Sequence, residues 1–384
     1  MYLCAHSYYS LRYGTIPPED LLKMASDAGL KDFCLTDINN TSAVLDFIRL
    51  SKKYNIHPVV GIDFRNNVQQ QFIAIAKNNN GYYEINKLLS EQQTSGEPIP
   101  DRCPALSDTF IIYPFKHTER TFGIDDLNEN EFIGIAPHEV ASLRFHLYKN
   151  RPDKLVALVP ISFRNKRDFN THRLLRAIDN NILLSKSPKT EEARDDEKFI
   201  SREELLEIYD DFPELISNTE KIISSSEVKF EFGSDAPMQN QSTYTGTVDG
   251  DYELVRALAM EGLAYRYPET TPAILERIEK ELSIIREKQY LSYFLINWDI
   301  TRYAREKGYF YVGRGSGANS ILAYLLRITD VDPIELDLYF ERFINLYRKN
   351  PPDFDIDFSW TDREDITNYI FSKFPNVCLL GAYV

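Results

Sequence analysis

The six residues from Asp353 to Phe358 constrain this chain more than any other segment, because they alternate a carboxylate with an apolar side chain. A period of two is typical of a β-strand and places Asp353, Asp355 and Asp357 on one face. Carboxylates this close resist ionising together, and divalent cations relieve the repulsion. Neighbouring carboxylates on a strand lie roughly 7 Å apart, which can bracket two ions about 3.5–4 Å from each other, as in two-metal phosphoryl transfer. The alternative is a solvated acidic edge strand.

A glycine-rich segment, Gly313-Arg314-Gly315-Ser316, lies upstream and is followed by the apolar run 321–326, which predicts a helix. Glycines let the backbone approach a phosphate closely, and backbone amides and a helix N-terminus favour its negative charge. Arg314 adds a charged fork and Ser316 a hydroxyl. The segment lacks the Gly-Lys-Ser/Thr of a Walker A loop, and alone it is more often a plain turn. Combined with the acidic strand, it indicates a site for a nucleoside triphosphate.

Four motifs follow one another in this part of the chain: Gly313–Ser316, Ile328–Pro333, Phe340–Phe343 and Pro352–Phe358. In this order they resemble the palm of the bacterial C-family DNA polymerases, the family of DNA polymerase III alpha subunits. The resemblance implies that Asp355 and Asp357 are catalytic and bind Mg²⁺, and that the loop from Gly313 to Ser316 binds the incoming nucleotide. It also implies a third catalytic carboxylate that lies further along than this sequence runs.

The first 87 residues alternate short apolar segments with helical patterns. Strands are expected at residues 2–5, 33–36, 58–64 and 72–76, and helices at 21–28, 43–54 and 82–90. Repeated βα units predict a parallel sheet or barrel. Four short motifs, at His6–Leu11, Leu35–Asp37, Val59–Asp63 and Ala76–Tyr82, resemble the PHP (polymerase and histidinol phosphatase) domain that opens the C-family polymerases.

The residues at the metal-ligand positions of the PHP domain have largely been replaced. Cys4 stands where the resemblance places the first histidine of a His-X-His pair, Tyr13 where it places an acid, and Ile38 where it places another histidine. A late Asp-X-His pair, expected near residues 160–163, is missing. Of the ligands only His6 and Asp63 remain, and these cannot fill a multi-metal site. We therefore expect this domain to be metal-free and structural.

These patterns predict an α/β protein in which a PHP-type distorted (βα) barrel is followed by an α+β polymerase palm segment of the nucleotidyltransferase-like kind. We expect the PHP-like domain at residues 1–235, a linker rich in Gly, Ser, Thr, Gln and Pro at 236–250, and the palm segment at 251–384. Helices are expected at 252–266, 272–288 and 291–307, directly before the glycine-rich loop.

Composition sets broad limits on the kind of protein. The chain has 384 residues, enough for two or three domains, and a net charge of −14, which argues against a surface coated with nucleic acid. No apolar run reaches membrane-spanning length, and no signal peptide is apparent, so a cytoplasmic protein is expected. The four cysteines are widely spread and have no Cys-X-X-Cys spacing, so neither a disulfide framework nor a zinc ribbon is indicated.

The resemblance implies a DNA-directed DNA polymerase that extends primers by two-metal nucleotidyl transfer. Its partners would be primer-template DNA, deoxynucleoside triphosphates, a sliding clamp and other replisome subunits, with a proofreading exonuclease as a possible partner of the PHP domain. Because members of the family are far longer, we expect this chain to be a fragment that is inactive alone. The residues Ala318-Asn319-Ser320 and Pro351-Pro352 slightly favour the error-prone branch. The alternatives are a PHP-type metallophosphoesterase or exonuclease, and a non-catalytic partner-binding module.

Overall fold

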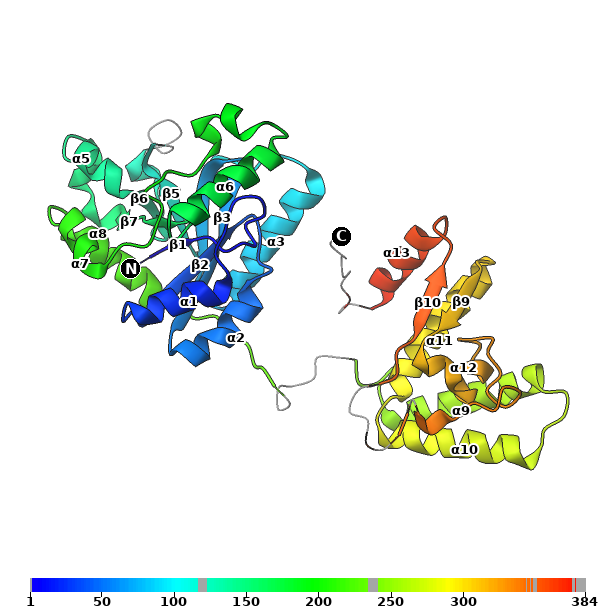
Figure 1. Ribbon diagram of the computed structural model, residues 1–384. Helices are drawn as coiled ribbons and strands as arrows, with labels where there is room; N and C mark the ends of the chain where they lie inside the picture. The colour runs from blue at the N-terminus through cyan, green and yellow to red at the C-terminus, as the bar shows by residue number, and fades with distance from the viewer. Residues whose placement is uncertain are drawn as a thin grey trace. The chain divides into compact units, whose positions relative to one another are not determined.

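The computed structural model describes residues 2–116, 123–233, 241–342, 344, 345, 347, 351–374 and 377. The chain divides into two compact units, unit 1 at residues 1–236 and unit 2 at residues 237–384 (Figure 1). Helix α9 begins at Val248, inside the segment predicted as a linker, and the first residues of that segment lie outside the described ranges. The assignment of these units as PHP and palm domains stays a prediction.

Unit 1 is built around a six-stranded sheet in the order β2-β3-β4-β5-β6-β7. Its strands are β2 (Asp32–Ile38), β3 (His57–Asn66), β4 (Gln69–Ala76), β5 (Thr109–Pro114), β6 (Glu131–Ile135) and β7 (Leu155–Ala157). A separate parallel pair joins β1 (Cys4–Ala5) to β8 (Pro160–Ile161). Helix α8 (Pro213–Ser224) contacts both β2 and β7, the two edge strands, so the sheet curls into a half-barrel, as the predicted barrel requires.

One strand breaks the predicted parallel order. β4 runs antiparallel to both of its neighbours, β3 and β5. Only Asn67 and Val68 separate β3 from β4, and Asn67 adopts a positive φ of 55°. A connection this short can only make a hairpin, because a parallel crossover needs a dozen or more residues. The expected parallel order is therefore wrong for β4 and correct for β2 and β3; β5, β6 and β7, which lie beyond the first 87 residues, also pair in parallel.

The helices of unit 1 begin and end where local chemistry dictates. Helix α1 begins three residues before the predicted range, with Pro18 in its first turn and two acids after it. Asn78 caps α3 by accepting from the amide of Gly81, and Asn165 and Ser201 cap α6 and α7 in the same way. The helices are α1 (Pro18–Asp27), α2 (Val44–Tyr54), α3 (Asn79–Ser95), α5 (Val140–Leu143), α6 (Lys166–Asp179), α7 (Arg202–Ile208) and α8. The residues that follow β1 contact the end of β2 and the residue after β8: the amide of Ser7 donates to Asp37 at 2.7 Å, and His6 Nδ1 lies 2.9 Å from Ser162 Oγ.

Unit 2 packs three long helices under a small ribbon. The helices α9 (Val248–Arg266), α10 (Pro272–Glu287) and α11 (Leu291–Lys307) agree closely with the predicted ranges. Short helix α12 (Ile321–Leu325) and helix α13 (Arg363–Lys373) complete the unit. Strands β9 (Tyr311–Arg314) and β10 (Asp355–Phe358) pair antiparallel and form the ribbon (Figure 1). Their pairing brings the glycine-rich loop and the acidic segment together.

Candidate functional site

The acidic strand is shorter than predicted. It begins at Asp355, and Asp353 lies just before it. In the ribbon, Asp355 is directly opposite Arg314, and Asp357 is opposite Val312. Residues opposite each other in a ribbon share a face, so both carboxylates and the guanidinium lie on one side.

Arg314 connects the two carboxylates that were predicted to bind metal. Its Nη1 donates to Asp355 Oδ2 at 2.8 Å, and its Nε donates to Asp357 Oδ2 at 2.7 Å. The hydrogen bond and the charge of Arg314 lower the pKa of Asp357. All three side chains are exposed, Arg314 to 60%. The repulsion between the two acids is thus relieved by Arg314 from the neighbouring strand. The sequence analysis predicted a phosphate-binding role for this arginine.

The apolar residues of the segment hold it against unit 2. The ring of Phe354 lies 5.4 Å from that of Tyr293 and 5.1 Å from that of Phe294, both on α11. Ile356 packs on the same core, and the ring of Phe358 lies 6.2 Å from that of Tyr311. The predicted division into an acidic face and an anchoring apolar face is therefore confirmed.

Asp353 has a different role from the other two acids. Its carboxylate accepts a hydrogen bond from Ser316 Oγ, and its backbone amide donates to the same oxygen at 3.2 Å. Its carbonyl accepts from the amide of Gly317 at 2.9 Å. The described residues do not gather the three aspartates closely enough to share one ion. Asp353 instead ties the glycine-rich loop to the start of β10.

Two glycines of the loop are required by close contacts within the chain. Gly315 has a φ of 94°, and a Cβ there would lie 2.6 Å from the carbonyl oxygen of Asp353. At Gly313 a Cβ would lie 2.0 Å from the carbonyl oxygen of Ile328. Thr329 Oγ1 also donates to the carbonyl of Gly313 at 3.0 Å. The loop thus joins three of the four motifs, and these glycines have a structural reason independent of any phosphate. In the remaining motif, Phe340–Phe343, the last residue, Phe343, lies outside the described residues.

The helix that follows the loop is capped from within the chain. Ser320 accepts from the amide of Ala323 at 3.3 Å and donates to Glu281 Oε2 at 2.6 Å. Glu281, on α10, is fully buried, and burial raises its pKa. This cap anchors the start of α12 to the core of unit 2.

The PHP-like residues form a second cluster in unit 1. His6 Nε2 lies 3.0 Å from Asp63 Oδ2, and Cys4 Sγ lies 3.5 Å from His6 Nε2 and 3.9 Å from Asp63 Oδ2. All three residues are fully buried. Within the described part of the chain, this is the one group of His, Cys, Asp or Glu side chains close enough to share an ion. Of the five residues predicted for this site, these three have side chains of ligand type, and the ring of Tyr13 lies 5.6 Å from that of His6.

A fourth residue, Arg65, completes the cluster and was not predicted. Its Nε and Nη2 donate to Asp63 Oδ2 at 2.9 and 2.7 Å, and its guanidinium lies 4.9 Å from the centre of the Tyr13 ring. Burial raises the pKa of a carboxyl, but the charge of Arg65 and the hydrogen bond from His6 outweigh it and lower the pKa of Asp63 to about 2. Asp63 and Arg65 are two residues apart on β3, a spacing that puts both on one face. That spacing is the signal that could have revealed Arg65.

The replaced ligand positions are filled by apolar side chains. Tyr13 packs with Phe163 and Ala193, and Ile38 packs against this cluster. The ring of His172, fully buried, lies 4.5 Å from that of Tyr13. Its Nδ1 donates to the carbonyl of Tyr13, and its Nε2 accepts from the amide of Ala193, both at 2.7 Å. Both nitrogens are thereby used within the fold, and His172 offers no free ligand atom.

The two clusters differ in how they could accept a metal. Around Asp355 and Asp357 the donors are carboxylate oxygens, which suit Mg²⁺, and the competing Arg314 is exposed and able to move into solvent. Around Asp63 the competing Arg65 is only 7% exposed and is held by the ring of Tyr13. The residues present therefore fit a metal at the ribbon and do not fit one in unit 1.

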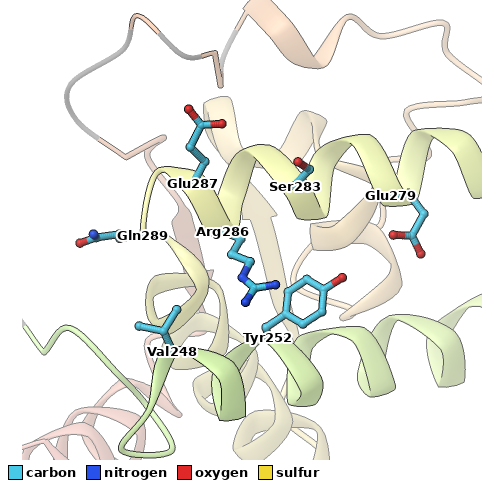
Figure 2. Close-up of a pocket in the computed structure, with 7 residues that line it drawn as sticks. All are labelled: Val248, Tyr252, Glu279, Ser283, Arg286, Glu287 and Gln289. Atoms are coloured by element: carbon cyan, nitrogen blue, oxygen red, sulfur yellow. The ribbon is translucent and has the colours of Figure 1, made fainter.

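A shallow groove of about 500 Å³ lies between α9 and α10 (Figure 2). Arg286 reaches across it, lies 4.6 Å from the centre of the Tyr252 ring, and donates to Asp249 Oδ1 at 2.7 Å. None of the residues that line it belongs to the ribbon or to the glycine-rich loop. The groove therefore does not extend the site on the ribbon.

Comparisons with known proteins find a matching family in each unit of the chain. Residues 3–118 match the PHP domain, and residues 253–380 match the bacterial DNA polymerase III alpha NTPase domain. The DNA polymerase III subunit alpha of Ureaplasma parvum is 31% identical over 97% of this chain, and that of Escherichia coli is 27% identical over 96%. The error-prone DNA polymerase of Symbiobacterium thermophilum is 28% identical over the whole chain.

The chain spans 36% of the length of the first two relatives and 40% of the third. Alpha subunits and an error-prone polymerase align at similar identity, so assignment to the error-prone branch stays a prediction. No helix among the described residues has the length and apolar character needed to cross a membrane.

Proposed function

Because this chain belongs to the bacterial DNA polymerase III alpha family over the part of that family's length that it spans, we propose that it supplies the metal-binding ribbon of a DNA-directed DNA polymerase. The observation that carries this proposal is the exposed face of the ribbon, where Arg314 meets Asp355 and Asp357. Two carboxylates and a mobile cation on one exposed face suit a reaction in which phosphate oxygens arrive together with metal ions.

Asp355 and Asp357 would hold Mg²⁺, which when bound activates the primer hydroxyl and neutralises charge on the triphosphate. Arg314, released from the two carboxylates, would turn to the phosphates of the incoming nucleotide, for which its planar fork is suited. The hydrogen bond between Ser316 and Asp353 holds the loop beside the start of β10. Gly315 lets the loop lie close to Asp353 at the start of β10, and Gly313 lets it lie close to Ile328.

The substrates in this proposal are primer-template DNA and deoxynucleoside triphosphates, and the setting is the bacterial cytoplasm. Contacts with a sliding clamp and other replisome subunits would come from the additional length of the relatives. Unit 1 is proposed to be structural and free of metal, because Arg65 neutralises Asp63 and apolar side chains replace two ligands. A proofreading exonuclease is a candidate partner of unit 1.

The direct test is primer extension by Asp355→Asn and Asp357→Asn in a protein that carries this chain together with the remaining length of its relatives. The amide keeps the shape of each side chain and removes the charge that attracts the metal, so synthesis should be nearly abolished while DNA binding is kept. Asp249→Asn is the control, because it removes an exposed, arginine-paired carboxylate charge on α9, away from the ribbon. Near-normal synthesis by either ribbon variant would contradict the proposal.

The second candidate function is phosphoester hydrolysis by unit 1, and one observation favours it: three buried side chains of ligand type lie together. The charge of Arg65 opposes it. Elemental analysis of the purified chain separates the two possibilities. Two or more transition-metal ions per chain, accompanied by hydrolysis, would support the phosphoesterase.

A further inference from the structure

We propose that Arg65 is the resident cation of unit 1: its guanidinium takes the place of a metal ion beside Asp63 and keeps the Cys4–His6–Asp63 cluster closed to metals. The proposal rests on the metal-free state proposed above and gives its cause. It predicts that the three ligands of the cluster would bind a metal once the Arg65 side chain is removed.

The spacing of the three ligand atoms is that of a metal site. A tetrahedral Zn²⁺ with usual bond lengths separates a sulfur from a nitrogen or an oxygen by about 3.6 Å, and a nitrogen from an oxygen by about 3.4 Å. Here the Cys4–His6, Cys4–Asp63 and His6–Asp63 distances are 3.5, 3.9 and 3.0 Å. Shifts of a few tenths of an ångström would make this set tetrahedral, with a fourth position for water.

The histidine is already held as a ligand is held. Ser162 Oγ donates to Glu197 Oε2 at 2.8 Å, so it accepts from His6 Nδ1, which lies 2.9 Å away. This arrangement directs His6 Nε2 at Asp63 and Cys4. A ligating histidine commonly makes such a bond with its other nitrogen, and that bond fixes the orientation of the ring.

Arg65 occupies the carboxylate oxygen that a metal would need. Arg65 Nε, Arg65 Nη2 and His6 Nε2 all lie within hydrogen-bonding distance of Asp63 Oδ2. The other oxygen, Asp63 Oδ1, is buried and has no hydrogen-bond partner among the described residues. A buried carboxylate oxygen without a hydrogen-bond donor is energetically costly. Asp63 Oδ1 is therefore an acceptor atom in the cluster that is free to take a donor or a metal ion.

Charge explains why a metal cannot join Arg65. With Zn²⁺ bound to the Cys4 thiolate, the Asp63 carboxylate and a neutral His6, the cluster would be neutral. The guanidinium would add a positive charge that touches the same carboxylate inside a fully buried cluster, where a charge without its own partner is strongly unfavourable. Displacing the Arg65 side chain would cost its contact with the Tyr13 ring and its ion pair with Asp63.

The test compares metal uptake by the 384-residue wild type, Arg65→Met and Arg65→Gln. Co²⁺ is the probe, because a Cys thiolate bound to it gives a charge-transfer band in the near ultraviolet. We expect the wild type to retain well under one equivalent and each variant to bind about one equivalent with that band, since affinity depends on the deprotonated ligands becoming free. The band should vanish in Cys4→Ser/Arg65→Met.

Arg176→Met is the matched control. Arg176 is also buried and lies 5.9 Å from the centre of the same Tyr13 ring, but it pairs with Asp179 and Glu191 rather than with Asp63. This variant should remain without Co²⁺, so uptake by it would overturn the assignment to Arg65.

Each remaining outcome decides one of the two proposals. Full occupancy of the wild type would contradict the metal-free state, and with it this inference. Folded Arg65 variants that take up no Co²⁺ would overturn the inference and leave the metal-free state intact. If both variants are unfolded without metal, refolding by Zn²⁺ would support the inference, and failure to refold would overturn it.

Discussion

Replacing Gly315 by alanine tests how tightly the glycine-rich loop is fitted to the acidic strand. Gly315 has φ and ψ of 94° and −179°, a region that is almost reserved for glycine and costs other residues ~1–3 kcal/mol. A Cβ there would also lie 2.6 Å from the carbonyl oxygen of Asp353, closer than real Cβ atoms come. Overpacking of this kind adds roughly 1 kcal/mol or more, so Gly315→Ala should lower the free energy of unfolding of unit 2 by ~2–4 kcal/mol.

Gly308→Ala is the matched control. Gly308 ends α11 with a φ of 76°, and nothing lies within 4 Å of the Cβ that would be added. Its replacement therefore carries only the cost of a left-handed backbone, ~1–2 kcal/mol. The difference between the two variants reports the contact with Asp353 together with the more restricted backbone conformation of Gly315.

Urea unfolding followed by tryptophan fluorescence is the suitable assay. The chain has two tryptophans, Trp298 and Trp360, and both lie in unit 2. The signal therefore reports the unit that carries the loop and is blind to unit 1. Equal free energies of unfolding for Gly315→Ala and Gly308→Ala would refute the argument that the loop is fitted to β10 by close contact.

The folded-state pKa of Asp63, about 2, lies below its ordinary value of 3.8, so ionised Asp63 stabilises unit 1 by ~2 kcal/mol above pH 4, and this contribution is lost as the pH falls through 2. The difference in free energy of unfolding between wild type and Asp63→Asn should shrink by that amount between pH 6 and pH 2, and a difference independent of pH would contradict the pKa. Arg314→Ala should bind Mn²⁺ more tightly than wild type in the absence of nucleotide, because the guanidinium no longer competes for the two carboxylates. Mn²⁺-dependent water relaxation measures this affinity, with Arg286→Ala as the control. Weaker binding would show that Arg314 assists the metal. Ser320→Ala removes the cap of α12 and a hydrogen-bond donor to buried Glu281, so the free energy of unfolding of unit 2 should fall by ~1–2 kcal/mol in the same urea assay. An unchanged free energy of unfolding would mean that the cap is dispensable.

The two arginine–aspartate clusters share their chemistry and differ in exposure. Arg314 is 60% exposed and Arg65 is 7% exposed. An exposed arginine exchanges a carboxylate for water at little cost, whereas a buried one leaves an unpaired charge behind. Exposure therefore separates a site that can exchange its cation from one that cannot.

Local patterns in the sequence were sufficient for much of this protein. The alternation from Asp353 to Phe358 predicted which side chains face the core, because a strand has a period of two whatever it pairs with. The helices of unit 2 were predicted within a few residues, because prolines, caps and apolar spacing act over one or two turns. Cys4, His6 and Asp63 were recognised by motif, and the fold places them together.

Only the tertiary structure decided which charges meet. Arg314 and Asp355 are 41 positions apart, and nothing in either segment states that β9 pairs with β10 in the register that puts them opposite each other. The reversal of β4 had the same origin, since a two-residue turn and not the periodicity set its direction. Arg65 closes the unit 1 cluster because β1, β3 and β8 converge there. Partners that are distant in sequence are chosen by the packing of whole elements, and periodicity within one segment carries no information about that choice.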